Sequence, residues 1–454
     1  MLTRLTLPQL GIGRAALTLG EGAGEAFAPA AKALFARLEA LGVPATLERQ
    51  VAVARCIKAL DECGAWDKRD AYYFIGADEL TWRQNWKQDL YNLTIVGTPT
   101  FESDRYVKGN GSNAAYDTNF NPTTAVGAKY QKDDCSMFVV TGTDLPNGAS
   151  VSYEIGNFSA WIGRHNSVPG RAVGRPQAGS TLTYANQVFP GHVAWSRSAA
   201  DLWEGYAHGL DHSDGGGTHA SVDLNNNNFY ICAAAGLSGG VNEILAAGFG
   251  GDLTPEEHAG EARAIRRYLL DIGAIQQGIV AYGDSTAFGT GATNWSTTWL
   301  RVMCDDYSPI RIPVTRGVAG YTPAQALARA QADGPHFDDH ILIVVDLPAS
   351  GENVATWATD IKALIAATGC SKWFILPPAQ DTTGSPVQSV TDVQALLLSD
   401  PYFAGHTLDA DDQAAYLAEV SDAGTRTEDS KHFDDDGQAI QAAYLKAAID
   451  AAGW

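Results

Sequence analysis

A serine stands where the chain could make it a nucleophile. Apolar residues 279–282 lead directly into Gly283, Asp284 and Ser285, and the residues after them favour a helix. A serine at the end of a parallel strand and the start of a helix has backbone N–H groups beside it, which stabilise an oxyanion. Because Gly-Asp-Ser also forms ordinary turns, the motif alone is weak. Ser285 is therefore a candidate nucleophile that needs a base.

A candidate base lies near the other end of the chain. Asp429 and His432 are three residues apart on a polar segment that precedes the last expected helix. A serine nucleophile needs a base to remove its proton, and a histidine base needs a carboxylate to fix its tautomer. The alternative is a solvated acidic loop, because three consecutive aspartates follow. Together the two motifs predict a serine hydrolase with Ser285 as nucleophile, His432 as base and Asp429 as its partner.

Metal chemistry has little support. Residues 210–217 and the asparagine run 225–228 offer oxygen ligands of the kind calcium prefers, but no twelve-residue loop ending in glutamate is present. The i, i+4 spacing of helical metal ligands is absent among His165, His192, His208 and His219. The six cysteines form no CxxC pair, so we expect reduced and mostly buried thiols. We expect no metal and no cofactor.

The charge balance limits the partners. The 454 residues include 31 Lys and Arg against 52 Asp and Glu, a net charge of −21. A surface this acidic repels phosphates, and no basic block reverses the balance locally, so we expect no nucleic-acid binding. No stretch approaches the roughly 18 consecutive apolar residues of a transmembrane helix, and the first residues lack the features of a signal peptide. We expect synthesis in a cytoplasm and no membrane insertion.

The length predicts two or three domains, and three textures follow one another along the chain. Residues 14–64 have apolar residues at i, i+3, i+4 and i+7, which predicts helices on either side of Pro44. Residues 71–249 contain short apolar runs between Gly, Asn, Pro and Asp turns, which predicts an antiparallel β-sandwich. A Thr-Pro-Glu-Glu sequence at 254–257 then predicts a capped helix that runs to Gly273. The expected strands are 91–96, 136–141, 151–155, 158–162, 192–196 and 228–233.

From Ile275 the pattern alternates between strand and helix. The expected strands are 278–282, 340–346 and 372–376, and the expected helices are 295–304, 354–368 and 438–451. Alternation at this spacing predicts a parallel sheet with helices on both faces. The expected organisation is a helical lead-in over 1–70, a β-sandwich over 71–273 and an α/β domain over 274–454.

The last of these segments resembles a known enzyme family. Residues 275–454 are similar to the SGNH hydrolases, the GDSL lipase and esterase superfamily. The matching blocks are Gly-Asp-Ser at 283–285, the glycine-bearing turn 316–322 and Asp-x-x-His at 429–432. The resemblance implies a three-layer α/β fold and the triad Ser285, His432 and Asp429. It also implies an oxyanion hole that includes the backbone N–H groups of Ser285 and Gly320.

One block departs from the family pattern. The family has Gly-x-Asn-Asp at the end of a strand, where the asparagine side chain donates to the oxyanion. Here Gly351-x-Asn353 follows the expected strand several residues late and lacks the aspartate. The resemblance implies Asn353 as a third oxyanion donor, with Ser350 as an alternative on the same loop. The other interpretation is that Asn353 caps the helix beginning at Val354, since Asn is a favoured N-cap.

The middle segment resembles a second family. Residues 71–273 are similar to a concanavalin A/laminin-G-like jelly-roll module of bacteriophage and prophage tail proteins. The similarity lies in motifs within 86–94, 97–101, 104–111 and 117–122, and in the closing helix. Members of this fold often bind glycans, so Trp161, Trp195 or Trp203 could stack on sugars. The alternative places these tryptophans in the core.

Two functions follow from these resemblances. In the first, the chain is a bacteriophage tail or fibre protein whose serine esterase domain removes acyl groups, O-acetyl above all, from host surface polysaccharide. In the second, it is a non-catalytic virion structural or glycan-binding protein with an SGNH-like domain that has lost activity. The expected partners are a host cell-surface glycan, other virion proteins and further copies of the chain, as a trimer by analogy with phage fibres.

Overall fold

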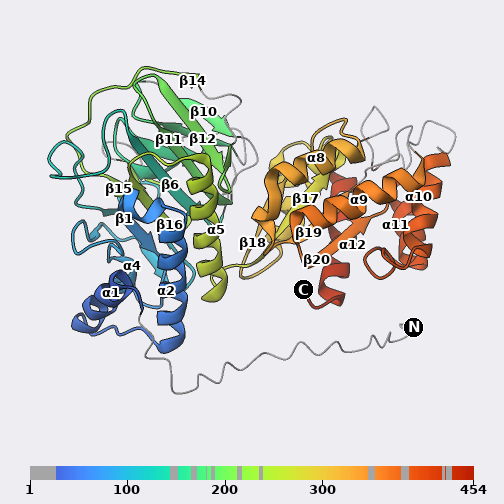
Figure 1. Ribbon diagram of the computed structural model, residues 1–454, viewed down its shortest axis with the longest axis horizontal. Helices are drawn as coiled ribbons and strands as arrows, with labels where there is room; N and C mark the ends of the chain where they lie inside the picture. The colour runs from blue at the N-terminus through green and yellow to red at the C-terminus, as the bar shows by residue number, and fades with distance from the viewer. Residues whose placement is uncertain are drawn as a thin grey trace.

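The computed structural model describes residues 27–143, 152–164, 171–179, 181–185, 190–211, 217–234, 239–345, 353–379, 388–421, 425 and 432–454. In this part of the chain, an N-terminal helical segment is followed by two antiparallel sheets, a long helix and a parallel sheet (Figure 1). The chain is thus a mixed α/β, multidomain protein, as its sequence textures predict.

The N-terminal segment folds as two helices that flank Pro44. The start of each helix is set by nearby residues. Pro29 begins the first helix, and Thr46 caps the second by accepting a hydrogen bond from the Arg49 N–H. The longer described helices are α1 (Pro29–Ala40), α2 (Leu47–Glu62), α5 (Pro255–Asp271), α8 (Pro323–Asp333), α9 (Val354–Thr368), α10 (Gln388–Ser399), α11 (Ala410–Val420) and α12 (Asp435–Ala451). The shorter segments are α3 (Ala65–Lys68), α4 (Glu79–Trp82), α6 (Ser285–Phe288), α7 (Trp299–Asp305), and the 3₁₀ turns η1 (Trp295–Thr297) and η2 (Gly334–Phe337).

Two antiparallel sheets form the middle of the chain. The first has the order β13-β12-β11-β6-β16-β4-β3, with β1 and β14 paired to β16 and β12. Its strands are β1 (Arg69–Phe74), β3 (Thr100–Glu102), β4 (Tyr106–Lys108), β6 (Cys135–Thr141), β11 (Gly191–Arg197), β12 (Leu202–Ala207), β13 (Leu210–Asp211), β14 (Gly217–Thr218) and β16 (Glu243–Gly250). The second has the order β10-β9-β8-β7-β15-β5-β2. Its strands are β2 (Thr94–Val96), β5 (Ala115–Asp117), β7 (Ser152–Gly156), β8 (Trp161–Arg164), β9 (Ala172–Arg175), β10 (Leu182–Ala185) and β15 (Tyr230–Ile231).

The two sheets share one core. Phe249 of β16 packs against Phe120 and Phe229, with ring centroids 4.6 and 5.0 Å apart. Each of the six predicted strand segments overlaps a strand, although β8 begins three residues later than expected. The three tryptophans considered as sugar platforms, Trp161, Trp195 and Trp203, are only 2%, 0% and 4% exposed. The alternative that places these tryptophans in the core is therefore confirmed, and the idea that they stack on sugars is wrong, because the side chains lie in the interior.

Helix α5 lies between the antiparallel sheets and the parallel sheet (Figure 1). It begins at the predicted cap, Thr254, which also forms a capping box: Thr254 and Glu257 exchange side-chain and backbone hydrogen bonds. Glu261 of this helix pairs with Arg69 of β1. Arg266 of the same helix pairs with Asp339, which lies in the α/β half. One helix therefore holds charged partners on both halves of the molecule.

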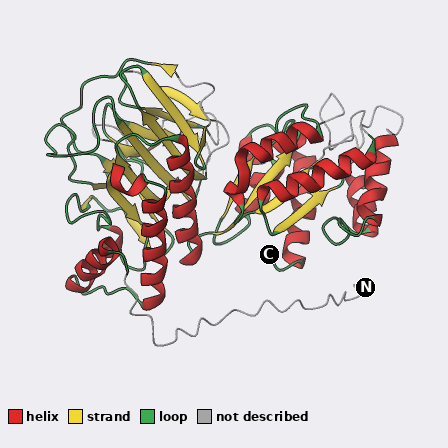
Figure 2. Ribbon diagram, in the orientation of Figure 1, coloured by secondary structure: helices red, strands yellow, loops and turns green. Residues whose placement is uncertain are grey.

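The parallel sheet has the order β18-β17-β19-β20, and helices cover both of its faces (Figure 2). Its strands are β17 (Gln276–Gly283), β18 (Arg311–Thr315), β19 (Ile341–Val345) and β20 (Lys372–Leu376). Alternate residues face opposite ways, so that Val280 packs in the core with α8 and α9 while Ile279 packs with α7 and α12. The carboxyl ends of the strands therefore meet along one edge, where the candidate site lies.

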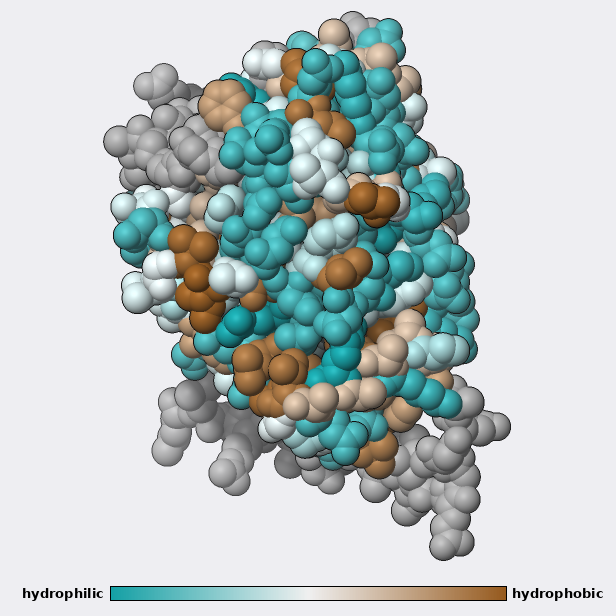
Figure 3. Space-filling view, turned by 90° about the vertical axis from the view of Figure 1, so that its left-hand side faces the viewer, coloured by the Kyte–Doolittle hydropathy of each residue, from teal (hydrophilic) through white to brown (hydrophobic). Residues whose placement is uncertain are grey.

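Figure 3 shows one face of the molecule. The face in Figure 3 is mostly hydrophilic, with hydrophobic residues scattered among polar ones. Within the described ranges, no helix combines the length and hydropathy that crossing a membrane requires.

The thiols are mostly interior, since five of the six free cysteines are buried and Cys63 is partly exposed.

Candidate active site

Ser285 is positioned by the junction between β17 and α6. The strand ends at Gly283, where a Cβ would lie 2.2 Å from the carbonyl oxygen of Val345, so only glycine fits. Asp284 then caps α6 by accepting a hydrogen bond from the Thr286 N–H at 2.9 Å. Ser285 is the first residue of the helix, half-buried, and its own N–H has no acceptor within the helix. The strand–turn–helix arrangement expected around Ser285 is therefore present.

His432 approaches Ser285 from a distant part of the chain. Its Nε2 lies 3.0 Å from the Ser285 Oγ, although the two residues are 147 positions apart. The hydroxyl can donate to Nε2 when that nitrogen carries no proton, which is the geometry a general base requires. The structure thus brings together two of the three predicted triad residues. The third, Asp429, lies outside the described residues.

The loop that follows Ser285 packs closely on the residues around His432. Gly291 has φ = +100°, and a Cβ there would lie 2.2 Å from the Phe433 carbonyl oxygen and 2.9 Å from the His432 Cβ. The Asp435 carboxylate accepts a hydrogen bond from the Thr293 N–H at 2.7 Å. Burial alone would raise the pKa of Asp435, but hydrogen bonds from Thr293 and Thr297 outweigh it and hold the pKa below its ordinary value. These contacts were not predicted from the sequence.

The glycine-bearing turn follows β18. Gly320 has φ = +79° and is exposed, and the space where its Cβ would lie is open. At the start of the turn, Arg316 pairs with Asp333 of α8 at 2.5–2.7 Å, and Tyr282 of β17 donates to the same carboxylate at 2.6 Å. This buried group, also missed from the sequence, anchors the turn to β17, the strand that leads into Ser285. The oxyanion role of Gly320 stays a prediction.

Asn353 lies at the start of α9. Its Oδ1 accepts hydrogen bonds from the Thr356 N–H at 2.9 Å and from the Thr356 hydroxyl at 3.2 Å, and the side chain is exposed. The capping interpretation is therefore confirmed, with Val354 as the first helical residue. The capping contacts occupy the oxygen, so any donation to an oxyanion would come from Nδ2, and that role stays a prediction. Ser350 lies outside the described residues.

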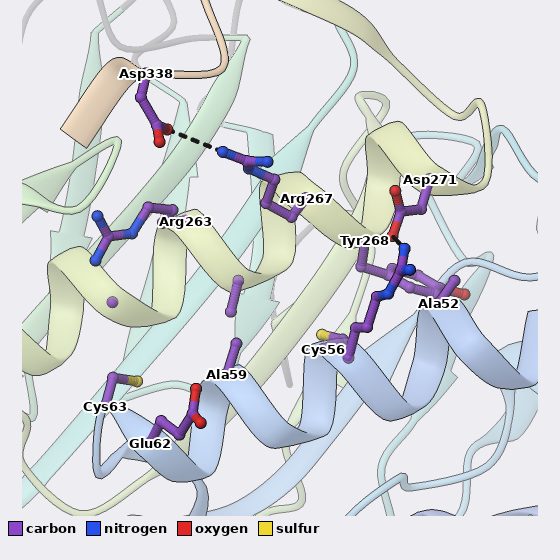
Figure 4. A pocket seen from close by; sticks show the side chains of 13 residues that line it. Ala52, Cys56, Ala59, Glu62, Cys63, Arg263, Arg267, Tyr268, Asp271 and Asp338 are labelled. Atoms are coloured by element: carbon purple, nitrogen blue, oxygen red, sulfur yellow. Dashed lines mark hydrogen bonds and ion pairs between the residues drawn. The ribbon is translucent and has the colours of Figure 1, made fainter. Parts of the chain in front are cut away.

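A separate cavity of about 750 Å³ lies between α2 and α5 (Figure 4). Figure 4 shows Arg267 turned toward Asp338, while Cys56 and Cys63 line the side formed by α2. Burial raises the pKa of both thiols, so neither is prepared to act as a nucleophile. None of the predicted site residues lines this cavity, and it lacks the nucleophile–base pair found at Ser285.

Metal ligands do not cluster in the part of the chain that the structure describes. There, no group of three or more His, Cys, Asp and Glu side chains could hold an ion. Most of the oxygen-rich loop 210–217, residues 212–216, falls outside that part. The chemistry available at Ser285 and His432 is that of a hydroxyl and an imidazole.

The comparisons with known proteins match a part of the chain and come from solved structures. No protein-family model and no curated protein matches the chain. Similar solved structures include a G-D-S-L family protein from Desulfitobacterium hafniense DCB-2, with 18% identity, a TM-score of 0.31, and coverage of 38% of this chain and 99% of that one. The lipase/acylhydrolase from Enterococcus faecalis has 16% identity, a TM-score of 0.33, and coverage of 39% and 97%. A two-domain esterase active on acetylated mannans has 13% identity, a TM-score of 0.32, and coverage of 39% and 50%.

These structural neighbours of about two-fifths of the chain are GDSL-type hydrolases and esterases. Their identities lie between 13% and 18%, so the comparison does not assign a function to this chain. The functional argument therefore depends on the chain's own residues.

Proposed function

We propose that residues 274–454 form a serine esterase domain of the SGNH type. The observation that carries the proposal is the 3.0 Å contact between Ser285 Oγ and His432 Nε2. The serine begins a helix directly after a strand of the parallel sheet, and the histidine precedes the last helix, as the two sequence motifs require. A nucleophile and a base brought together from opposite ends of a domain are the signature of covalent acyl transfer.

The mechanism follows from this contact. His432 accepts the Ser285 proton at Nε2 while Oγ attacks the ester carbonyl, and the carbonyl oxygen becomes an oxyanion. The N–H groups of Ser285 and Gly320 are the proposed donors to that oxyanion. His432 then gives the proton to the departing alcohol, leaving an acyl group on Ser285. Water then attacks the acyl carbon with His432 again as base, the bond to Oγ breaks to release the carboxylic acid, and the imidazole returns the proton to Ser285. Asp429 is the proposed partner of the imidazole.

The finer function rests on the sequence resemblances. We propose that the acyl group is O-acetyl and that its carrier is a polysaccharide of a host cell surface. The tail-protein motifs within residues 86–122 support a place in a bacteriophage tail or fibre, where the antiparallel sheets would bind the glycan or other virion proteins. No cofactor enters the proposed reaction.

A second candidate function is favoured by Asn353. Its side-chain oxygen caps α9 and its position departs from the family pattern, so an oxyanion donor could be missing. The loss of one such donor typically lowers the rate by roughly 10²–10³-fold. In this second function the chain is a non-catalytic structural or glycan-binding protein of the virion.

Hydrolysis of p-nitrophenyl acetate by the full chain separates the two functions. We expect turnover by the wild type, and a fall in kcat of at least about 10³-fold in Ser285→Ala and in His432→Ala. Ser399→Ala is the matched control, because Ser399 lies at the end of α10 and, among the described residues, its hydroxyl bonds to carbonyl oxygens of its own helix. Wild type and S285A that are equally inert would favour the second function. Acetate release from O-acetylated polysaccharides then tests the substrate class.

A further inference from the structure

A buried glutamine joins the two segments that carry the proposed nucleophile and base. Gln438 lies in the first turns of α12 and is 0% exposed. Its amide oxygen accepts a hydrogen bond from the Trp299 N–H at 2.9 Å. Its amide nitrogen donates to the carbonyl oxygens of Phe433 at 3.3 Å and Thr290 at 3.5 Å. One side chain thus contacts backbone groups of three separate segments.

Each of these backbone groups is connected to the reacting pair, either along the chain or through a hydrogen bond. Phe433 follows His432 directly. Trp299 begins α7, and its indole Nε1 donates to the carbonyl oxygen of Thr286, the residue after Ser285, at 3.0 Å. Thr298, the N-cap of α7, makes no side-chain capping bond, so the Gln438 oxygen takes an acceptor's place at that helix start. The amide therefore connects the neighbours of Ser285 with the neighbour of His432.

The chemistry of the position requires an uncharged amide. One end of the side chain meets an N–H, and the other end meets two carbonyl oxygens. A carboxylate can accept from Trp299 but cannot donate to Phe433 or Thr290, and an apolar side chain can do neither. Because the site is buried, each lost partner leaves a polar backbone group unsatisfied.

We propose that Gln438 is a positioning residue that fixes the separation and orientation of the His432 imidazole relative to the Ser285 hydroxyl. It acts together with the close contact of Gly291 on Phe433 and the hydrogen bond from Thr293 to Asp435. Its catalytic consequence rests on the proposed function, whereas the positioning itself does not. Misplacement of a reacting group by about 1 Å can lower a rate roughly 10²-fold.

The same helix offers a matched control. Gln441 lies one turn further along α12 and is also 0% exposed. Neither atom of its amide has a hydrogen-bond partner among the described residues, so Gln441 bonds to neither segment of the site. The variants Gln438→Met and Gln441→Met remove the same amide from the same helix. They differ in whether the amide bonds to the segments around Ser285 and His432.

The first experiment compares kcat and KM of the full-length variants on p-nitrophenyl acetate. We expect Q438M to lower kcat about 10- to 100-fold with KM changed less than about threefold, while Q441M keeps kcat within about twofold. Equal losses in the two variants would reduce Gln438 to a general packing role, and unchanged kcat in Q438M would also overturn the proposal. Where Q438M does not fold, Gln438→Asn replaces it, since it keeps an uncharged amide that is one methylene too short to reach all three partners.

The second experiment does not depend on catalysis. The ring signal of His432 is followed by NMR in full-length protein with labelled histidine and is identified by its absence in His432→Gln. We expect Q438M to shift this signal and Q441M to leave it in place. An inert wild type in which Q438M still shifts the signal would contradict the esterase proposal and keep the positioning role. A signal that is unchanged in Q438M would overturn that role.

Discussion

At the residue scale, the two polar atoms of the Asn353 side chain have different possible roles, one in capping a helix and one in catalysis. Its oxygen holds the start of α9 through Thr356, and its nitrogen is the group that could serve an oxyanion. Serine offers an oxygen acceptor for the cap and has no amide nitrogen, whereas alanine offers neither. The two substitutions therefore report on different functions of one residue.

We expect Asn353→Ala to lower the free energy of unfolding by about 1 kcal/mol and Asn353→Ser to lower it by less, because only alanine removes the cap. We expect kcat to stay within about threefold in both, since the exposed side chain is oriented by the helix start. Urea unfolding and p-nitrophenyl acetate turnover measure the two effects. A fall in kcat of about 10²-fold in N353S, with stability kept, would instead establish Asn353 as an oxyanion donor.

At the scale of elements, the site depends on how closely the loop after α6 approaches the segment before α12. Gly291 makes this approach possible, because it combines a positive φ with the absence of a side chain facing Phe433. Gly405 also has a positive φ, +84°, but a Cβ there would meet open space. Substitution of Gly405 therefore introduces backbone strain alone, whereas substitution of Gly291 introduces backbone strain and a steric clash.

We expect Gly405→Ala to cost about 1–2 kcal/mol of stability through backbone strain alone, with esterase activity unchanged. Gly291→Ala adds a contact of 2.2 Å with a backbone oxygen, so the segment that carries His432 must move. We therefore expect a larger loss of stability and a fall in kcat of at least about tenfold. If thermal unfolding and turnover change equally in the two variants, the approach at Gly291 is not what holds the site.

At the scale of the whole molecule, buried histidines gather where α5 meets both halves. A cavity of about 20 Å³ there is lined by His192, His208 and His340 together with apolar residues and Arg266. Arg266 donates hydrogen bonds to the Asp339 carboxylate and to the carbonyl oxygen of His336. The Nε2 of His336 lies 2.6 Å from the carbonyl oxygen of His208. The junction between the two halves is therefore built on imidazoles and one buried ion pair.

These imidazoles are expected to make the protein sensitive to acid. Burial, aided by nearby arginines, lowers the pKa of His192 and of His336 to about 3, and burial also lowers the pKa values of His258 and His340. Unfolded histidines bind protons near pH 6.5, so the native state binds fewer protons below that pH. The stability that these groups contribute is full above about pH 6.5 and falls as the pH drops toward 3. Asp252 has the opposite effect on stability. Burial raises its pKa to about 6, so its contribution to stability grows as the pH falls through 6.

His192 provides the test, because neither of its ring nitrogens has a hydrogen-bond partner among the described residues. The variant His192→Phe keeps a ring stacked on Phe138 and removes the titrating group. We expect the loss of stability between pH 7.5 and pH 5 to shrink by about 2 kcal/mol in H192F. Urea unfolding at the two pH values measures this difference. The same pH dependence in wild type and variant would show that His192 does not contribute.

Much of the fold could be predicted because its signals are local. The cap at Thr254, the limits of α9 and β20, and the strand that leads into Ser285 depend on residues within a few positions of one another. The pair β1 and β16 was missed, and for β16 the reason is its composition, since it is rich in alanine and glycine and Ile244 is its one β-branched residue. Its strand conformation comes from pairing with β1 and β6.

The sequence by itself determined the residue types of the site: a serine placed between a strand and a helix, and a histidine before the last helix. Tertiary structure alone decided that the two lie 3.0 Å apart, that Gln438 contacts the neighbours of both, and that Asn353 caps α9. It also decided that the tryptophans considered as sugar platforms lie inside. The physical reason is distance along the chain. Capping and periodicity act between near neighbours, whereas a contact across 147 residues depends on the packing of every element between them.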